Sequence, residues 1–163
     1  FNYLKLKYML LIMNFKEQFE KDYFMGKLNE KKLIKYLNDI DPETYYLCRQ
    51  RFSLMDFKKF NDDKFLGELK SRNCKKDKWK TAIISTNKIE KAIKDTNGTL
   101  YKFYYLYEDG LYYYDFNKED IDNGIIFKDW WCRYSRGQEE KKMVYYIPRE
   151  LLTFITDEIN SLN

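Results

Sequence analysis

Asp56, Glu68 and Lys70 have the residue types and the spacing that would hold a divalent cation beside a phosphate group. Glu68 and Lys70 are two positions apart in the strand-like run FLGELK. Because successive side chains of a strand alternate between its faces, both point the same way. Asp56 lies one predicted turn upstream, so two neighbouring strands can bring both carboxylates close to Lys70. Two carboxylates directed at one point are unfavourable unless a cation lies between them, and Mg²⁺ is the cation that we expect.

The sequence contains no histidine, which limits the chemistry available to it. Ser-His-Asp triads, histidine-ligated zinc and nucleases with a histidine base are excluded, so catalysis would depend on carboxylates, lysine, tyrosine, a thiol or a magnesium-activated water. Cys48, Cys74 and Cys132 have no C-x-x-C spacing, and we expect neither a disulfide framework nor a zinc site. Free thiols fit a reducing compartment, and we expect a cytoplasmic protein, in the host cytoplasm if it is viral.

Length and charge indicate one domain of ordinary size. A chain of 163 residues is long enough for a substantial core, and its net charge of +4 permits a nucleic-acid partner without requiring one. We take residues 1–13 as an N-terminal extension, which is a strand, a helix or an upstream reading artefact, and residues 14–163 as the single domain. The extension is short and interrupted by Lys5 and Lys7, so we expect no membrane partner.

Apolar periodicity predicts helices around a strand-rich centre. Helices are expected over residues 14–24, where Gly26 ends the pattern, and over 29–40, 86–95 and 148–159. Strand-like runs occupy residues 44–60, 64–70, 81–85, 100–108, 111–116, 125–134 and 142–147. Asp109-Gly110 is a strong signal for a hairpin between two of these runs. This order indicates an α/β domain with a central mixed β-sheet flanked by helices.

Several of these segments together resemble the PD-(D/E)xK nuclease superfamily, in particular compact members from phages and large DNA viruses. The resemblance is carried by Asp56, the strand GELKSR, the run WKTAIISTNKIEKA and the upstream helix GKLNEKKLIKYL. It covers roughly residues 26–114 and implies a restriction-endonuclease-like core. Met55 stands where the family motif has proline, which weakens the motif without changing a metal ligand.

The resemblance also implies a role for each motif residue. Asp56 and Glu68 would hold Mg²⁺, for which Mn²⁺ can substitute, with the carbonyl of Leu69 as a third ligand. Lys70 would orient or help deprotonate the attacking water and offset charge in the transition state. Glu30 would bind the metal or its water shell as an additional carboxylate.

Glu30 is selected by the resemblance alone, since Glu17 and Glu20 lie on the same helical segment. Lys88, on the helix after the E-x-K strand, could reach the scissile phosphate. A basic series is expected to follow nucleic-acid phosphates or, alternatively, to form a solvated face: Arg72, Lys75, Lys76, Lys78 and Lys80.

Aromatic residues are abundant, with 16 tyrosines and 12 phenylalanines, but A/T-rich codons account for most of this excess. The count alone therefore gives no support for base stacking. The pair Trp130-Trp131, followed by Arg133 and Arg136, could wedge into a duplex or stack a flipped base, although packing in the core is the simpler explanation.

These features predict a magnesium-dependent endonuclease that hydrolyses phosphodiester bonds, in DNA rather than RNA by the resemblance, and a homodimer is compatible with that resemblance. The alternative is a catalytically inactive module of the same fold that binds nucleic acid or protein, as a virion or scaffold component. An E-x-K motif at a strand edge is also commonly an exposed ion pair, worth about 0–1 kcal/mol. The two hypotheses differ in whether Asp56, Glu68 and Lys70 converge.

Overall fold

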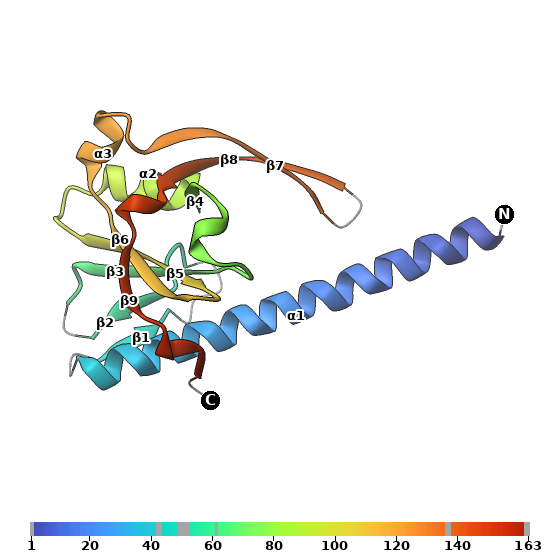
Figure 1. Cartoon of the computed structure of the whole chain (residues 1–163), viewed down its shortest axis with the longest axis horizontal. Helices are drawn as coiled ribbons and strands as arrows, with labels where there is room; N and C mark the ends of the chain where they lie inside the picture. Colours follow the sequence, from blue (N-terminus) through green and yellow to red (C-terminus); the bar gives the residue numbers. More distant parts are fainter. Residues whose placement is uncertain (1, 42–43, 49–52, 61, 136–137, 162–163) are drawn as a thin grey trace.

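The computed structural model describes residues 2–41, 44–48, 53–60, 62–135 and 138–161, with side chains in these ranges except those of 2–15, 133–135, 138 and 160–161. Two β-sheets form the body, one of six strands in the order β1-β2-β3-β5-β6-β9 and one of three strands in the order β4-β8-β7. A long helix, α1, runs along one side, and the β7–β8 hairpin extends from the body on the same side as the N-terminal half of α1 (Figure 1).

The six-stranded sheet is mixed. Its strands are β1 (Tyr45–Leu47), β2 (Phe57–Lys59), β3 (Phe65–Ser71), β5 (Leu100–Tyr107), β6 (Gly110–Asp115) and β9 (Thr153–Thr156). The pair β3–β5 is parallel, and the other described neighbours in this sheet are antiparallel. The predicted hairpin at Asp109-Gly110 is confirmed, because Tyr107 pairs with Gly110, which has a positive φ of 145°.

The three-stranded sheet is antiparallel. Its strands are β4 (Thr81–Ser85), β7 (Phe127–Ser135) and β8 (Gln138–Pro148). A short 3₁₀ turn, η1 (Lys76–Lys78), lies in the connection between β3 and β4. The mixed α/β class predicted from the sequence is therefore confirmed.

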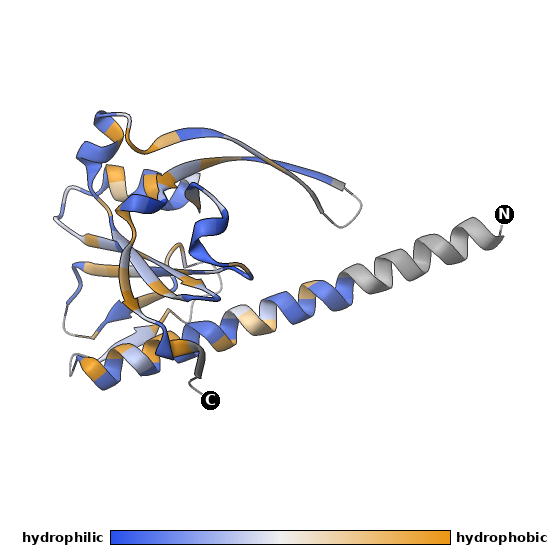
Figure 2. Cartoon of the chain, viewed as in Figure 1, coloured by the Kyte–Doolittle hydropathy of each residue, from blue (hydrophilic) through white to orange (hydrophobic). Residues whose placement is uncertain are grey.

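Helix α1 (Asn2–Ile40) is continuous, so the predicted break at Gly26 is wrong. A Cβ added at Gly26 would meet nothing within 4 Å, and a single glycine costs a helix only about 1 kcal/mol. Residues 2–13 belong to the same helix. Among its described side chains, Leu33 and Leu37 are buried, and apolar residues gather where the helix meets the sheet (Figure 2).

The two remaining helices are shorter. Helix α2 (Thr86–Lys94) matches the prediction, whereas α3 (Lys118–Asp122) was not predicted. The Asn117 side chain caps α3 by accepting a hydrogen bond of 3.1 Å from the amide of Glu119.

The predicted terminal helix over residues 148–159 is wrong. The segment instead forms a 3₁₀ turn, η2 (Arg149–Leu151), then β9, then a second turn, η3 (Glu158–Ser161). The residues of β9 are Thr, Phe, Ile and Thr, types that favour strands, and β9 pairs with the edge of β6. Tertiary pairing therefore overrides the helical spacing of the apolar residues.

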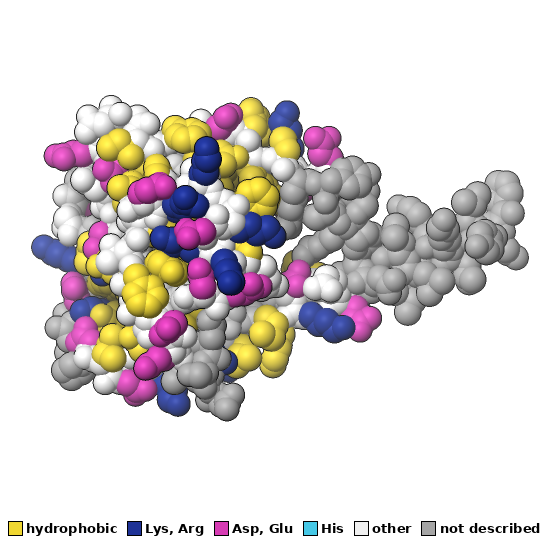
Figure 3. Space-filling view, viewed as in Figure 1, with side chains coloured by type: hydrophobic (Ala, Val, Ile, Leu, Met, Phe, Trp, Pro, Cys, Tyr) yellow, Lys and Arg dark blue, Asp and Glu magenta, His cyan; other side chains and the backbone are white. Residues whose placement is uncertain are grey.

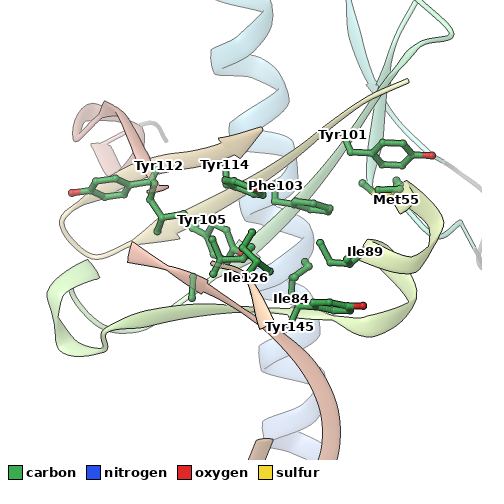
Figure 4. Close-up of a cluster of buried hydrophobic side chains, with 14 of the residues drawn as sticks. Met55, Ile84, Ile89, Tyr101, Phe103, Tyr105, Tyr112, Tyr114, Ile126 and Tyr145 are labelled. Carbon is green, nitrogen blue, oxygen red and sulfur yellow. The ribbon is translucent and has the colours of Figure 1, made fainter. Parts of the chain in front are cut away.

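The six-stranded sheet has an apolar cluster on each face. On one face Leu33 and Leu37 of α1 pack in a cluster that includes Phe57 and Leu69. On the other face Leu66 and Phe103 share a cluster with Ile84 of β4 and Ile89 of α2 (Figure 4). Because strand residues alternate, Glu68 and Lys70 point to the same face as Leu66, which is the face that α2 covers.

Candidate active site

Asp56 and Glu68 lie next to each other across the β2–β3 pair. Phe57 is paired with Gly67, and Asp56 is the residue just before β2. The Asp56 amide donates to the Gly67 carbonyl at 2.9 Å, and Asp56 Oδ2 accepts from the Leu69 amide at 2.9 Å. The Asp56 carboxylate therefore lies at the edge of β3 just beyond the end of β2, close enough to Glu68 for its charge to raise the pKa of Glu68.

A glycine sets the distance between these two strands. The ring of Phe57 covers Gly67 so closely that a Cβ there would lie 2.3 Å from Phe57 Cζ. Phe57 is fully buried, so its ring has little room to withdraw. This contact fixes β2 on β3 and thereby fixes Asp56 beside Glu68.

Glu68 is a buried carboxylate held by two lysines. Its side chain is 1% exposed; Lys70 Nζ lies 2.5 Å from Oε1 and Lys88 Nζ lies 2.7 Å from Oε2. Lys88 also donates a hydrogen bond to the carbonyl of Leu54, close to Asp56 in the chain. Burial is the largest influence on the pKa of Glu68 and raises it. The positive charges of Lys70 and Lys88 lower this pKa, and the negative charge of Asp56 raises it.

Glu30 approaches the same cluster from α1. Its side chain is 12% exposed and pairs with Lys27 at 2.7 Å, while neighbouring Asn29 donates to the Ser71 hydroxyl at 3.0 Å and ties the helix to the end of β3. Burial raises the pKa of Glu30 and the hydrogen bond from Lys27 lowers it; the charge of Asp56 raises it further and that of Lys70 lowers it. Glu30 is therefore within electrostatic reach of Asp56 and Lys70.

The other helical carboxylates remain in solvent. Glu17 pairs with Lys21 at 3.3 Å, with both side chains 67% exposed, and Glu20 is exposed as well. Glu30 differs from both, because its side chain is only 12% exposed and the charge of Asp56 raises its pKa.

The oxygen donors around Asp56 are of the kind that a hard divalent cation binds. The carboxylates of Asp56, Glu68 and Glu30 are oxygen donors, and the Leu69 carbonyl faces the Asp56 edge because both backbone polar groups of a strand residue point toward the same neighbour. Within the described part of the chain, no three acidic or cysteine side chains are close enough to form a metal site by themselves. Mg²⁺ commonly takes one or two carboxylates and keeps several waters, so this set is compatible with it.

The predicted phosphate-binding residues separate into two groups. Arg72 and Lys88 lie close to the cluster: Arg72 follows the end of β3, and Lys88 bonds to Glu68. The other four, Lys75, Lys76, Lys78 and Lys80, belong to the β3–β4 connection around η1.

Acidic residues interrupt that second group. Asp77 lies 4.0 Å from Lys76 Nζ and 3.6 Å from Arg149 Nη1. Figure 3 shows positive and negative side chains interspersed over one face of the molecule. The connection around η1 is thus not a continuous basic surface, and phosphate contacts by its lysines stay a prediction.

Trp130 and Trp131 point to opposite faces of the β7–β8 hairpin, where they pair with Met143 and Lys142. Neither tryptophan is buried, so core packing does not account for them. The side chain of Arg133 and all of Arg136 lie outside the described residues.

Sequence reasoning missed that Trp131 faces a cavity shared with Lys70 and Arg72. The available signal was the alternation of Trp130 and Trp131 along a strand. The three cysteines are free thiols, and Cys74 packs against the cluster that contains Ile84 and Ile89.

Comparisons of the chain with protein-family models, with curated proteins and with solved structures found no match. In the part of the chain that the structure describes, no helix combines the length and the apolar composition required to cross a bilayer. The geometry of the carboxylate and lysine cluster is therefore the basis on which a function is assigned below.

Proposed function

We propose that the protein is a divalent-metal-dependent nuclease of the PD-(D/E)xK type, which hydrolyses phosphodiester bonds and, by family resemblance, acts on DNA. One observation carries the proposal. Asp56 and Glu68 come together on one edge of β3, where two lysines contact Glu68 and Glu30 approaches from α1. Residues from three separate segments thus meet at one place, and Glu30 of a fourth segment lies within electrostatic reach of it.

Such a cluster is costly if it only supports the fold. Burying a carboxylate carries a desolvation penalty of several kcal/mol, and a second carboxylate nearby adds repulsion. Groups perturbed by burial together with specific charged partners are concentrated at functional sites. The raised pKa values of Glu30 and Glu68 fit this pattern.

Each residue has a role consistent with its contacts. When bound, Mg²⁺ would draw charge from the phosphate and activate a water. The Leu69 amide fixes the orientation of the Asp56 carboxylate. Lys70 places a positive charge where charge develops on the phosphate, and Lys88 orients Glu68 from the opposite side. Glu30, which is 12% exposed and within electrostatic reach of Asp56 and Lys70, would bind the metal or its water shell.

A second candidate is a module of this fold that binds nucleic acid without cleaving it. The observation in its favour is that Lys70 and Lys88 already satisfy both oxygens of Glu68. A closed ion cluster of this kind can also serve only to define the packing of β3 against α2.

Incubation of the purified protein with supercoiled plasmid, with Mg²⁺, with Mn²⁺ or with a chelator, separates the two candidates. The nuclease requires metal-dependent nicking that is lost in Glu68→Gln and Lys70→Ala. Asp115→Asn is the matched control, because Asp115 pairs with Lys102 at 3.2 Å on another strand of the same sheet. Plasmid binding without nicking under every metal would instead establish the binding module.

A further inference from the structure

A cavity of about 700 Å³ adjoins the proposed active site. It lies between the end of β3, strand β4 and the β7–β8 hairpin, and Lys70 belongs both to its wall and to the Glu68 cluster. Its volume falls within the range of about 300–1,000 Å³ that is usual for small-ligand sites. A group bound in the cavity would therefore lie next to any phosphate held at Asp56 and Glu68.

The wall combines cations with aromatic rings. The cations are Lys70, Arg72 and Lys142, and the rings belong to Trp79, Tyr107, Trp131 and Tyr146. No acidic side chain is among the described lining residues, although the whole chain has 26 acidic against 30 basic residues. Lys70 pairs with Glu68 and Lys142 pairs with Glu140 at 3.5 Å, so the positive charge that favours an anionic ligand is chiefly that of Arg72.

Arg72 is fixed in the wall without a carboxylate partner among the described residues. Its guanidinium donates to the Ser71 carbonyl at 3.3 Å and to the Ile83 carbonyl at 3.4 Å. Backbone carbonyls orient the guanidinium but leave its full charge available. A guanidinium placed in this way is suited to a phosphate, whose oxygens match its planar donors.

The aromatic part of the wall is partly ordered in advance. The Tyr107 ring stacks on the buried ring of Tyr105, with centroids 6.3 Å apart and an interplanar angle of 20°. Lys142 Nζ lies 4.9 Å from the centre of the Trp131 ring. Trp79 is 62% exposed, so its ring is accessible to a ligand.

The geometry points to a binding site for an unpaired nucleotide of the substrate strand, adjacent to the scissile phosphate. Its base would stack against Trp79 and Trp131, and its phosphate would contact Arg72. Stacking on aromatic rings next to a positively charged groove is how single-stranded nucleic acid is bound without base-pair readout. This inference rests on the proposed function for the position of the cut, and it specifies the substrate as a strand with at least one unpaired nucleotide.

The test is equilibrium binding of a single-stranded oligonucleotide of about ten thymidines to the full chain in chelator, measured by fluorescence anisotropy. Trp79→Ala and Trp131→Ala should each weaken binding about 10-fold. Trp130→Ala is the matched control and should leave it unchanged, since Trp130 points to the opposite face of the hairpin. Arg72→Ala should weaken binding and reduce the salt slope by about one.

Two further ligands isolate the contribution of the base and of the strand. The wild-type protein should bind an abasic strand of the same length about as weakly as the Trp131→Ala protein binds the normal strand. Thymidine monophosphate should bind to the wild-type protein more weakly than the normal strand does. Trp79→Phe and Trp131→Phe, which keep a ring, should restore most of the affinity. The inference would be overturned if the wild-type protein and both tryptophan-to-alanine variants bound the strand with equal affinity. It would also be overturned if the normal and the abasic strand bound equally well, or if the mononucleotide bound as tightly as the strand.

Binding in chelator does not depend on cleavage, so the two proposals can fail separately. Nicking that requires Glu68, together with unchanged strand affinity in both alanine variants, would remove the nucleotide site and keep the nuclease. Strand binding that requires Trp79 and Trp131, in a protein that never nicks plasmid, would keep the nucleotide site and remove the nuclease.

Discussion

Lys88 Nζ lies 2.7 Å from Glu68 Oε2, and this ion pair joins the first turn of α2 to the middle of β3. The same ammonium donates to the Leu54 carbonyl, two residues before Asp56. Lys88 therefore connects the three segments that supply the helix, the E-x-K strand and the aspartate. Its removal affects both the charge and the geometry of the cluster.

Lys88→Met is expected to destabilise the protein by about 1–3 kcal/mol, because buried Glu68 loses one of its two cationic partners. Lys91→Met is the control, because Lys91 lies on the same helix but acts on Asp95 and is not among the charges that act on Glu68. The free energy of unfolding from urea titration measures both changes. Equal stability of the two variants would show that the Lys88 contact contributes nothing to the fold.

Asp56→Asn should raise the melting temperature of metal-free protein by about 2–4 °C. The amide keeps an oxygen that can accept from the Leu69 amide, while the negative charge that acts on Glu30 and Glu68 disappears. Asp56→Ala removes the acceptor as well and should fall below Asp56→Asn. Thermal unfolding in chelator compares the three proteins, and a clear loss of stability in Asp56→Asn would mean that Asp56 is structural.

Stability should depend on pH through Glu30. Burial raises the pKa of Glu30 in the folded state above its ordinary value of 4.5, so the folded state binds more protons than the unfolded state between the two pKa values. The contribution of Glu30 to the free energy of unfolding therefore falls as the pH rises from 4.5 through the pKa of Glu30 in the folded state, and it is constant above that pKa. Glu30→Gln removes this decrease in stability with rising pH.

Urea titrations at several pH values above and below 4.5 measure the difference between wild type and Glu30→Gln. The variant should gain stability relative to wild type as the pH rises, and the difference should vanish at low pH. A difference that does not change with pH would contradict a raised pKa at Glu30.

Gly67→Ala should destabilise the protein by about 1–3 kcal/mol and reduce nicking, because the new methyl group would overlap the Phe57 ring and displace β2. Gly26→Ala is the opposite case. It lies within α1 with open space around it, and should stabilise the protein by about 0.5–1 kcal/mol. Thermal unfolding and plasmid nicking of both variants check the pair, and full activity of Gly67→Ala would show that β2 does not position Asp56.

The parts of the site that follow from local periodicity could be predicted from the sequence. Alternation along β3 places Glu68 and Lys70 on one face, and the short turn before β3 places Asp56 at the start of the adjacent strand. The hairpin at Gly110 is likewise a local signal, because the glycine adopts a positive φ.

The parts of the fold and of the site that depend on contacts between distant segments could not be predicted from the sequence. β9 has helical apolar spacing, yet pairs with the edge of β6. The cavity beside Lys70 takes Trp79 from the β3–β4 connection and Trp131 from β7, segments far apart in the chain. No local pattern indicates that these two rings share a wall.

The parallel pairing of β3 with β5 has a consequence for folding. The chain between these strands contains β4 and α2, so this pairing closes a long loop and needs the intervening unit to be in place. Long-range closures of this kind are slow steps in folding. Since Lys88 lies within the enclosed unit and Glu68 on β3, their ion pair should form late, and a refolding protein should recover activity only after most of its secondary structure has returned.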